Sequence, residues 1–225
     1  MQYLYYILLG LVSYIIGNFS GARIVASVKK SDITHAGSGN PGTLNVWRTY
    51  GFWPGIFTFV FDAVKGVIPT LTAYLTFGYL GCEPEIAVYV AAFAVVLGHI
   101  FPVIFKFKGG KGIATSVGVF IVINWWVSLI AFAVMIVGML FIKYASIFTI
   151  GYVIAMAIVE ICIMNPALWV NYIFVSGILL LVVWAHRGNI VRLLKGKENK
   201  TELLAMLKKI CKKKQNVADS GDQAK

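Results

Sequence analysis

The sequence has 225 residues, of which 59% are hydrophobic and 13% are charged, and its formal net charge at pH 7 is +11. Soluble domains are about half apolar and about one quarter charged, so this composition excludes an ordinary soluble globule and, for most of the chain, disorder. The three cysteines, Cys82, Cys162 and Cys211, are scattered and odd in number, which argues against a disulfide framework. The composition therefore predicts an all-α polytopic membrane protein.

Apolar runs of membrane-spanning length recur along the chain, and we expect seven transmembrane helices. The first run precedes the first basic residue, Arg23, so we interpret it as a retained helix rather than a cleaved signal peptide. The fourth run is short and is followed by Asn124 and two tryptophans, so we expect residues 113–142 to form a tight hairpin. The seven runs are 3–22, 53–80, 86–105, 113–123, 126–142, 146–164 and 168–185.

The basic residues predict the orientation. They follow the first, third, fifth and seventh predicted helices, the turns between carry none, and only Lys65 falls inside a span. Under the positive-inside rule this places the N-terminus outside and the C-terminus in the cytoplasm. We expect residues 1–198 to form the membrane domain. Residues 199–225 are expected to form a basic cytoplasmic tail, first an amphipathic helix on anionic lipid and then disordered.

Three polar clusters lie on the predicted cytoplasmic side. The first is a loop rich in glycine, hydroxyl and amide groups over residues 37–45, with Arg48 behind it. The second covers residues 98–112, and the third covers residues 186–198. Taken singly, each cluster also fits an interpretation without function. The first would be a flexible surface loop, the second a glycine turn in a basic loop, and the third a solvated juxtamembrane stretch. Together on one membrane face they predict a site for an anionic substrate.

The second cluster carries the clearest chemistry. A glycine-rich turn with lysines runs directly into an apolar helix, and the N–H groups at a helix start attract phosphate. The spacing differs from that of a Walker A loop. Within a span, Asp62 and Lys65 lie three residues apart, which fits either a neutralised pair or a functional one. Glu160 is given no role.

The three clusters resemble the motifs of a known family, the bacterial membrane glycerol-3-phosphate acyltransferases that use acyl phosphate, called PlsY. The family pattern Ser-Gly-Asn-x-Gly-Ala-Thr-Asn with a later Arg is similar to residues 38–45 and Arg48. Gly-His-x-Phe-Pro followed by Lys-Phe-Lys-Gly-Gly-Lys-Gly is matched at residues 98–102 and 106–112. His-Arg-x-Asn-Ile-x-Arg-Leu with a later Gly-x-Glu is matched at residues 186–198.

The resemblance implies transfer of a fatty acyl group from acyl phosphate to the 1-hydroxyl of sn-glycerol 3-phosphate. The products are 1-acyl-glycerol 3-phosphate (lysophosphatidic acid) and phosphate, in the first step of phospholipid synthesis. The expected catalytic residues are Ser38, Arg48, Lys106, His186 and Asn189. The expected substrate-binding residues are Asn40, Gly42, Asn45, Gly109, Gly110, Lys111 and Gly112. Structural support is expected from His99, Asp62, Lys65, Arg192 and Glu198.

Within that assignment, Lys106 and the loop 109–112 are expected to hold the acyl-phosphate head, and the first cluster is expected to hold glycerol 3-phosphate. The general base is either His186 or the donor phosphate. One departure from the family pattern concerns Thr43 and Leu44, which stand where the family has Ala-Thr. The hydroxyl is displaced by one position, so no role is carried onto Leu44, and Thr43 is a candidate substitute.

The chain lacks the His-x-x-x-x-Asp arrangement that marks acyltransferases using acyl thioesters, which agrees with an acyl-phosphate donor. No metal-ligand cluster is visible, so we expect neither a metal nor a cofactor. The expected partners are the two small-molecule substrates, membrane lipid and other phospholipid-synthesis enzymes, without nucleic acid. We expect a multi-pass protein of the bacterial inner membrane with its active site facing the cytoplasm. The alternative is a transporter of a phosphorylated solute, and a weaker one is a scaffold that docks through its basic tail.

Overall fold

The computed structural model describes residues 1–164, 166–201, 203 and 205. Every regular element within these residues is a helix, as predicted. The α-helices are α1 (Gln2–Asn18), α2 (Gly21–Val28), α3 (Thr43–Tyr50), α4 (Phe52–Thr76), α5 (Pro84–Ile100), α6 (Ile113–Ile123), α7 (Trp125–Phe141), α8 (Ala145–Ile163), α9 (Val170–Ala185) and α10 (Arg187–Leu194). Short 3-10 helices cover Ile33–His35, Phe77–Leu80, Val103–Phe105 and Pro166–Leu168.

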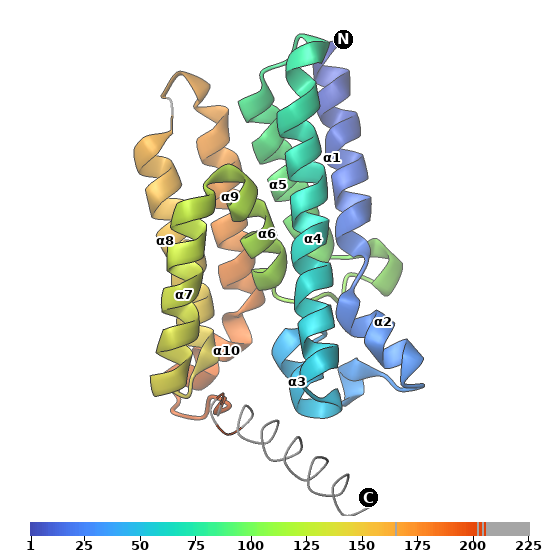
Figure 1. The fold of residues 1–225 in the computed structure, drawn as a ribbon, viewed down its shortest axis with the longest axis vertical. Coiled ribbons are helices and arrows are strands. Elements are labelled where there is room, and N and C mark those ends of the chain that lie inside the picture. The colour runs from blue at the N-terminus through green and yellow to red at the C-terminus, as the bar shows by residue number, and fades with distance from the viewer. Residues whose placement is uncertain (165, 202, 204, 206–225) are drawn as a thin grey trace, which may run out of the picture.

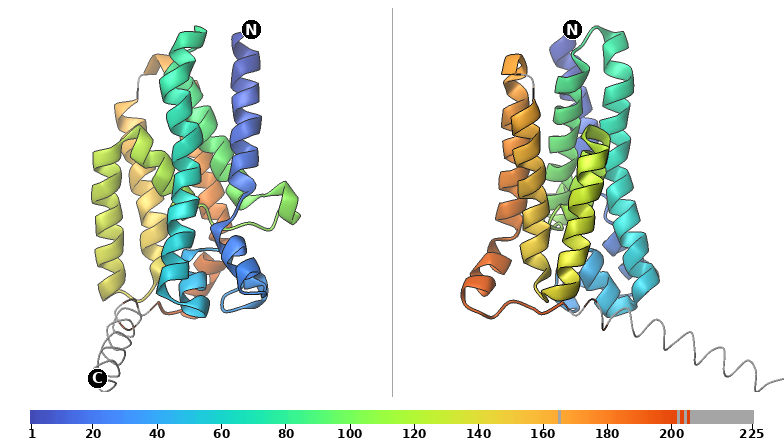
Figure 2. Two further views of the ribbon diagram at one scale, coloured as in Figure 1. Left: turned by 45° about the vertical axis from the view of Figure 1, so that its right-hand side comes forward. Right: turned by 60° about the vertical axis from the view of Figure 1, so that its left-hand side comes forward.

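The long helices form a bundle, and the short helices α2, α3 and α10 lie together at one end of it (Figure 1). We call this the α3 end. Figure 2 shows that the N-terminus and the turn between α4 and α5 lie at the opposite end. A buried apolar core between α5, α6, α7, α8 and α9 holds these helices together, with Val96, Phe120, Met156 and Ile178 at its centre. The predicted tail helix lies mostly outside the described residues.

Four stretches of the described chain are long and apolar enough to cross a membrane: Gln2–Val28, Phe52–Leu80, Pro84–Phe105 and Ala145–Ile163. A fifth candidate joins α9 to α10 across a bend of 56°. The helices α6 and α7 are apolar but shorter. All seven predicted runs are therefore helical for most of their length, and the helices are those of a multi-pass membrane protein. That seven of them cross the bilayer stays a prediction.

Two predicted helices end earlier than expected. The run 3–22 is broken after Asn18, and Ser20 starts α2 by accepting a hydrogen bond from the Arg23 N–H at 3.4 Å. The run 86–105 stops at Ile100, because the proline at 102 disfavours a helical conformation for the residue before it. The second break releases residues 101–112 as a connection that leaves the bundle and returns to α6.

The hairpin predicted over residues 113–142 consists of α6 and α7, separated by Asn124. Figure 1 shows that its turn stops short of the level that the other long helices reach. Eleven residues of α-helix extend only about 16 Å, whereas the hydrocarbon core of a bilayer is about 30 Å thick. The hairpin therefore brings α6 into the bundle and returns α7 to the α3 end without requiring a full crossing.

Glycines let two pairs of helices pack backbone to backbone, as membrane helices commonly do. A Cβ on Gly98 of α5 would lie 2.1 Å from the Tyr14 carbonyl oxygen of α1. A Cβ on Gly118 of α6 would lie 1.9 Å from the Ala63 carbonyl oxygen of α4. Both distances are far below a van der Waals contact, so any side chain there would force the helices apart. The second contact fixes α6 against α4.

Candidate active site

A cavity of about 860 Å³ lies at the α3 end of the bundle, and it brings all three predicted clusters together. Its walls come from loops and helix ends that are distant in the sequence. The polar side chains lining it are Ser38, Asn40, Thr43, Asn45, Arg48, Asp62, His99, Lys111, Ser146, Thr149, His186, Arg187, Asn189, Arg192, Glu198, Asn199 and Thr201.

Helix starts give this cavity its electrostatic character. The helices α3, α6, α8 and α10 all begin at the cavity, and the residue that precedes each of them makes no side-chain capping hydrogen bond. The first N–H groups of a helix carry a partial positive charge and bind anions. Lys111 stands just before α6, and Arg48 of the last turn of α3 also lines the cavity, so two cations share the cavity with these helix starts. The cavity is therefore suited to more than one phosphate group.

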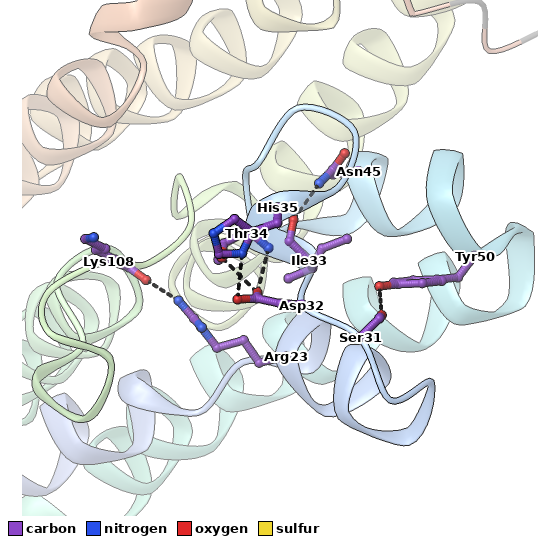
Figure 3. Close-up of polar contacts among 9 residues, drawn as sticks. All are labelled: Arg23, Ser31, Asp32, Ile33, Thr34, His35, Asn45, Tyr50 and Lys108. Carbon is purple, nitrogen blue, oxygen red and sulfur yellow. Dashed lines mark hydrogen bonds and ion pairs between the residues drawn. The ribbon is translucent and has the colours of Figure 1, made fainter.

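The first cluster is held in shape by Asn45, which is 2% exposed. Its Oδ1 accepts a hydrogen bond from the Ser38 N–H at 2.8 Å, and its Nδ2 donates to the Ala36 carbonyl at 2.9 Å. Figure 3 shows that the same amide also reaches the Ile33 carbonyl, at 3.4 Å. These contacts engage both ends of the amide with the loop, so Asn45 positions Ser38 at the cavity.

Two contacts outside the cavity brace the loops that build it. Asp32 accepts a hydrogen bond from the Thr34 N–H at 2.8 Å and lies 3.0 Å from Nδ1 of His35, which closes the turn before the first cluster (Figure 3). Arg23 donates to the Lys108 carbonyl at 2.8 Å. The second bond ties α2 to the connection between α5 and α6.

Close backbone packing explains the glycines of the second cluster. The Gly110 N–H donates to the His99 carbonyl at 3.2 Å, and a Cβ on Gly110 would lie 2.3 Å from His99 Nε2. A Cβ on Gly109 would lie 2.1 Å from the same carbonyl. Gly112 has φ of 84°, in the left-handed region that favours glycine. Only glycines let the loop lie against the end of α5 and turn directly into α6.

Asn189 is the hub of a polar network that links Lys111 to the third cluster. Its Nζ donates to Asn189 Oδ1 at 2.5 Å. The Asn189 Nδ2 donates to Glu198 Oε1 at 2.6 Å and to Ser146 Oγ at 2.8 Å. Arg192 Nε donates to Glu198 Oε2 at 2.9 Å. Through Asn189, the network joins the starts of α6, α8 and α10.

Burial changes the protonation of this network. It lowers the pKa of Lys111 to about 8, an effect that nearby Glu198 opposes and that Arg192 and Arg48 add to. Burial alone would raise the pKa of Glu198, but hydrogen bonds from Ser146 and Asn189, with the charge of Arg192, hold it below its ordinary value. At neutral pH the lysine is therefore mostly charged and the carboxylate is ionised.

His186, at the junction of α9 and α10, is 2% exposed. Its Nδ1 lies 2.8 Å from the Val182 carbonyl, which fixes the tautomer with the proton on Nδ1. Its Nε2 lies 3.4 Å from Thr149 Oγ1. Burial and nearby Lys111 lower the pKa of His186 to about 4, so the ring is neutral at pH 7. It offers the cavity an acceptor nitrogen rather than a charge.

Asp62, Lys65 and His99 form a buried cluster at the floor of the cavity. The Lys65 ammonium lies 3.0 Å from Asp62 Oδ1 and donates to the Gly17 carbonyl at 3.1 Å and to the Phe19 carbonyl. Asp62 also accepts from the Gly21 N–H at 3.2 Å. The pair therefore neutralises itself and joins α4 to the break between α1 and α2, which are the contacts expected of structural support.

The cavity continues into an apolar wall between α4 and α7. Phe59 of α4 stacks on Phe132 of α7 with ring centroids 5.5 Å apart. The apolar side chains lining this part are Ile56, Phe59, Phe132, Met135, Ile136, Met139 and Leu140. One cavity thus joins a cationic, amide-rich end to an apolar end, as an amphipathic substrate requires.

Comparison with known proteins identifies the family to which the chain belongs. The family model for glycerol-3-phosphate acyltransferase matches residues 7–196. The chain belongs to that family. A glycerol-3-phosphate acyltransferase of Finegoldia magna is 39% identical over 202 residues, covering 89% of this chain and 98% of that protein. One of Clostridioides difficile is 36% identical over 201 residues, covering 89% and 97%.

Solved structures agree with the sequence comparison. The glycerol 3-phosphate form of PlsY (YgiH), an integral membrane glycerol 3-phosphate acyltransferase, has a TM-score of 0.80 and 34% identity to this chain. The match covers 90% of this chain and 98% of that one. The lysophosphatidic acid form of the same protein has a TM-score of 0.78. The predicted resemblance to the PlsY family is confirmed, and with it acyl transfer to glycerol 3-phosphate and an integral membrane setting.

In this glycerol-3-phosphate acyltransferase, the predicted site residues line the cavity with three exceptions, Lys65, Lys106 and Gly110. Lys65 and Gly110 lie directly behind residues that do line it, through Asp62 and His99. Lys106 differs, because it is exposed on the connection that projects from the side of the bundle, drawn in green in Figure 2. Its left-handed backbone, with φ of 52°, follows the short helix Val103–Phe105. The contact of Lys106 with an acyl-phosphate head stays a prediction without support from the geometry.

The structure also shows where Thr43 and Leu44, the two residues that depart from the family pattern, are located. Both residues line the cavity at the start of α3. The Leu44 side chain packs on the buried cluster of Met139, Ala145 and Leu203. This position therefore extends the apolar wall, and Thr43 keeps a hydroxyl at the cavity.

Sequence reasoning missed three hydroxyl residues of the site, Ser146, Thr149 and Thr201. Ser146 and Thr149 lie three residues apart at the start of α8, so both face the same side of the helix. That spacing after Lys143, on the predicted cytoplasmic side, is the signal that could have found them. Thr201 carries no such signal.

Proposed function

We propose that the chain transfers a fatty acyl group from acyl phosphate to the 1-hydroxyl of sn-glycerol 3-phosphate, giving lysophosphatidic acid and phosphate. The observation that carries the proposal is the single cavity, cationic at one end and apolar at the other. An acyl phosphate has a phosphate head and a hydrocarbon tail, and its co-substrate carries a second phosphate. Both phosphates must be held close together against their repulsion, which calls for cations and oriented N–H groups.

Each of the two phosphate groups would bind at the start of a different helix. The donor head would bind at the start of α6, beside Lys111 and the backbone of residues 109–112. Glycerol 3-phosphate would bind at the start of α3, with Arg48, Ser38 and Asn40 around it. The acyl chain would run along the wall between α4 and α7 toward the bilayer. Asn189 would hold the Lys111 ammonium in place between the two.

The chemical step needs little from a base. The substrate hydroxyl oxygen attacks the acyl carbonyl carbon, and the bond from that carbon to the phosphate oxygen breaks. The hydroxyl proton passes to the departing phosphate, so lysophosphatidic acid and phosphate are the only products. A general base works best with a pKa near the working pH, and that of His186 is about 4. We therefore assign proton uptake to the phosphate and hydrogen-bond acceptance to His186 Nε2.

We further propose a bacterial inner membrane protein with seven membrane helices, its N-terminus outside and the cavity facing the cytoplasm. The distribution of basic residues supports this orientation. The hairpin of α6 and α7 enters and leaves on the same side of the membrane, so the orientation is the same whether or not the hairpin crosses completely.

The experiment replaces each of the two cations. Arg48→Ala and Lys111→Ala are expected to lower kcat/KM for lysophosphatidic acid formation by about 10- to 100-fold, since a charged hydrogen bond contributes about 1.5–3 kcal/mol. Lys111→Ala should act mainly on the KM for acyl phosphate, and Arg48→Ala on that for glycerol 3-phosphate. Lys29→Ala is the control, because this exposed lysine does not line the cavity. Near-normal turnover by both variants would contradict the site.

A further inference from the structure

The chain beyond residue 196, where the family model's match ends, returns to the mouth of the cavity. Glu198, Asn199, Thr201 and Leu203 all line it. Thr201 is 3% exposed and Leu203 is 5% exposed. Such burial makes these residues part of the wall of the site, rather than the beginning of a solvated tail.

The segment is fixed at Thr201 itself and two residues after it. The Thr201 N–H donates to the Lys143 carbonyl in the connection between α7 and α8. Two residues later, the Leu203 side chain packs in the cluster of Met139 and Ala145, against which Leu44 of α3 also lies. Thr201 is therefore held in place by its own backbone and by its neighbour, independently of what its hydroxyl contacts.

That hydroxyl meets the guanidinium assigned to glycerol 3-phosphate. Arg48 Nη2 donates a hydrogen bond to Thr201 Oγ1 at 2.5 Å. Arg48 is an exposed residue on the short helix α3, and a long exposed side chain samples many rotamers. Glu198 attracts the guanidinium, but its carboxylate is already engaged by Ser146, Asn189 and Arg192.

We propose that Thr201 is a positioning residue for Arg48, holding the guanidinium at the cavity before glycerol 3-phosphate arrives. The inference deepens the proposed function and rests on the role given there to Arg48. A ligand binds more tightly to a side chain already in the bound conformation, because less ordering is required on binding. Loss of the hydroxyl should thus weaken binding of glycerol 3-phosphate and leave the chemical step nearly unchanged.

The test compares Thr201→Val, which removes the hydroxyl at constant shape, with Thr201→Ser, which keeps it. In the full-length protein, Thr201→Val is expected to raise the KM for glycerol 3-phosphate about 5-fold, with kcat within about twofold of the unaltered chain. Thr201→Ser should keep the original KM. Thr76→Val is the matched control, since this exposed threonine at the opposite end bonds only within α4.

A second arm removes Arg48. In an Arg48→Ala background, Thr201→Val should have no further effect on the KM, because residues acting as a unit are not additive. An unchanged KM in Thr201→Val, an equal loss in Thr201→Ser, or an undiminished effect without Arg48 would each overturn the proposal. A thermal unfolding curve shows whether Thr201→Val still folds. If it does not, the KM for glycerol 3-phosphate is compared between the Thr201→Ser and Leu203→Ala variants instead.

Failure of the proposed function is distinguishable from failure of this inference. If the unaltered chain makes no lysophosphatidic acid from acyl phosphate, the proposed donor is wrong. Direct binding of glycerol 3-phosphate, measured by calorimetry without any donor, then gives the same comparison. A weaker affinity in Thr201→Val alone would still support positioning of Arg48, and equal affinities in all variants would overturn it.

Discussion

At the scale of single residues, the protonation of Lys111 sets the pH range in which the cavity can bind phosphate. Its pKa is lowered to about 8, so its charge is present below pH 8 and is lost above it. We expect kcat/KM for acyl phosphate to fall about tenfold per pH unit on the alkaline side of pH 8, as for a single ionisation. A pH–rate profile of initial rates measures this directly.

Lys111→Arg is the companion variant for that profile. Arginine stays charged across the whole range, although it cannot reproduce the lysine geometry. Its activity should be lower overall and should lack the fall above pH 8. An identical alkaline fall in Lys111→Arg would assign the ionisation to another group.

The residue scale also shows where sequence reasoning succeeds. Gly109 and Gly112 were expected at the site because a glycine-rich turn before a helix has a recognisable pattern, Asn189 was expected from the family resemblance, and all three line the cavity. Thr201 could not, since a lone hydroxyl residue has no spacing to mark it and its contact with Arg48 joins positions far apart in the chain. Lys106 was expected to hold a substrate head; it is exposed on the connection after α5 and does not line the cavity, so that contact stays a prediction.

At the scale of helices, α6 is positioned by a backbone contact of its middle with α4. A Cβ on Gly118 would lie 1.9 Å from the Ala63 carbonyl oxygen, whereas a Cβ on Gly151 of α8 would meet nothing within 4 Å. We expect Gly118→Ala to lower the melting temperature by several degrees, as for a loss of about 2–3 kcal/mol by overpacking. Thermal unfolding in detergent measures the effect.

Gly151→Ala is the matched control, because it makes the same chemical change in another membrane helix. It should leave stability unchanged or raise it, since alanine favours helix by about 1 kcal/mol over glycine. Equal melting temperatures for the two variants would contradict the tight contact of α4 with α6. The helices themselves follow from the apolar runs, but this contact and the break at Ser20 depend on tertiary packing and could not be read from them.

At the scale of the whole molecule, the α3 end of the bundle is expected to face the cytoplasm. In a chain with its three cysteines replaced by serine, single cysteines are introduced at Tyr79→Cys or Lys195→Cys, both exposed positions near opposite ends. A membrane-impermeant thiol reagent added to intact cells should label the first variant and leave the second unlabelled until the cells are opened. The reverse pattern would invert the topology.

The central claim is that acyl phosphate is the donor for a cavity that holds two phosphates and one acyl chain. Purified protein would be given glycerol 3-phosphate with palmitoyl phosphate, and separately with palmitoyl coenzyme A, while phosphate release and lysophosphatidic acid are both followed. The account predicts product from palmitoyl phosphate alone, with one phosphate released for each lysophosphatidic acid formed. Product from the coenzyme A thioester alone, or from neither donor with a folded protein, would contradict it.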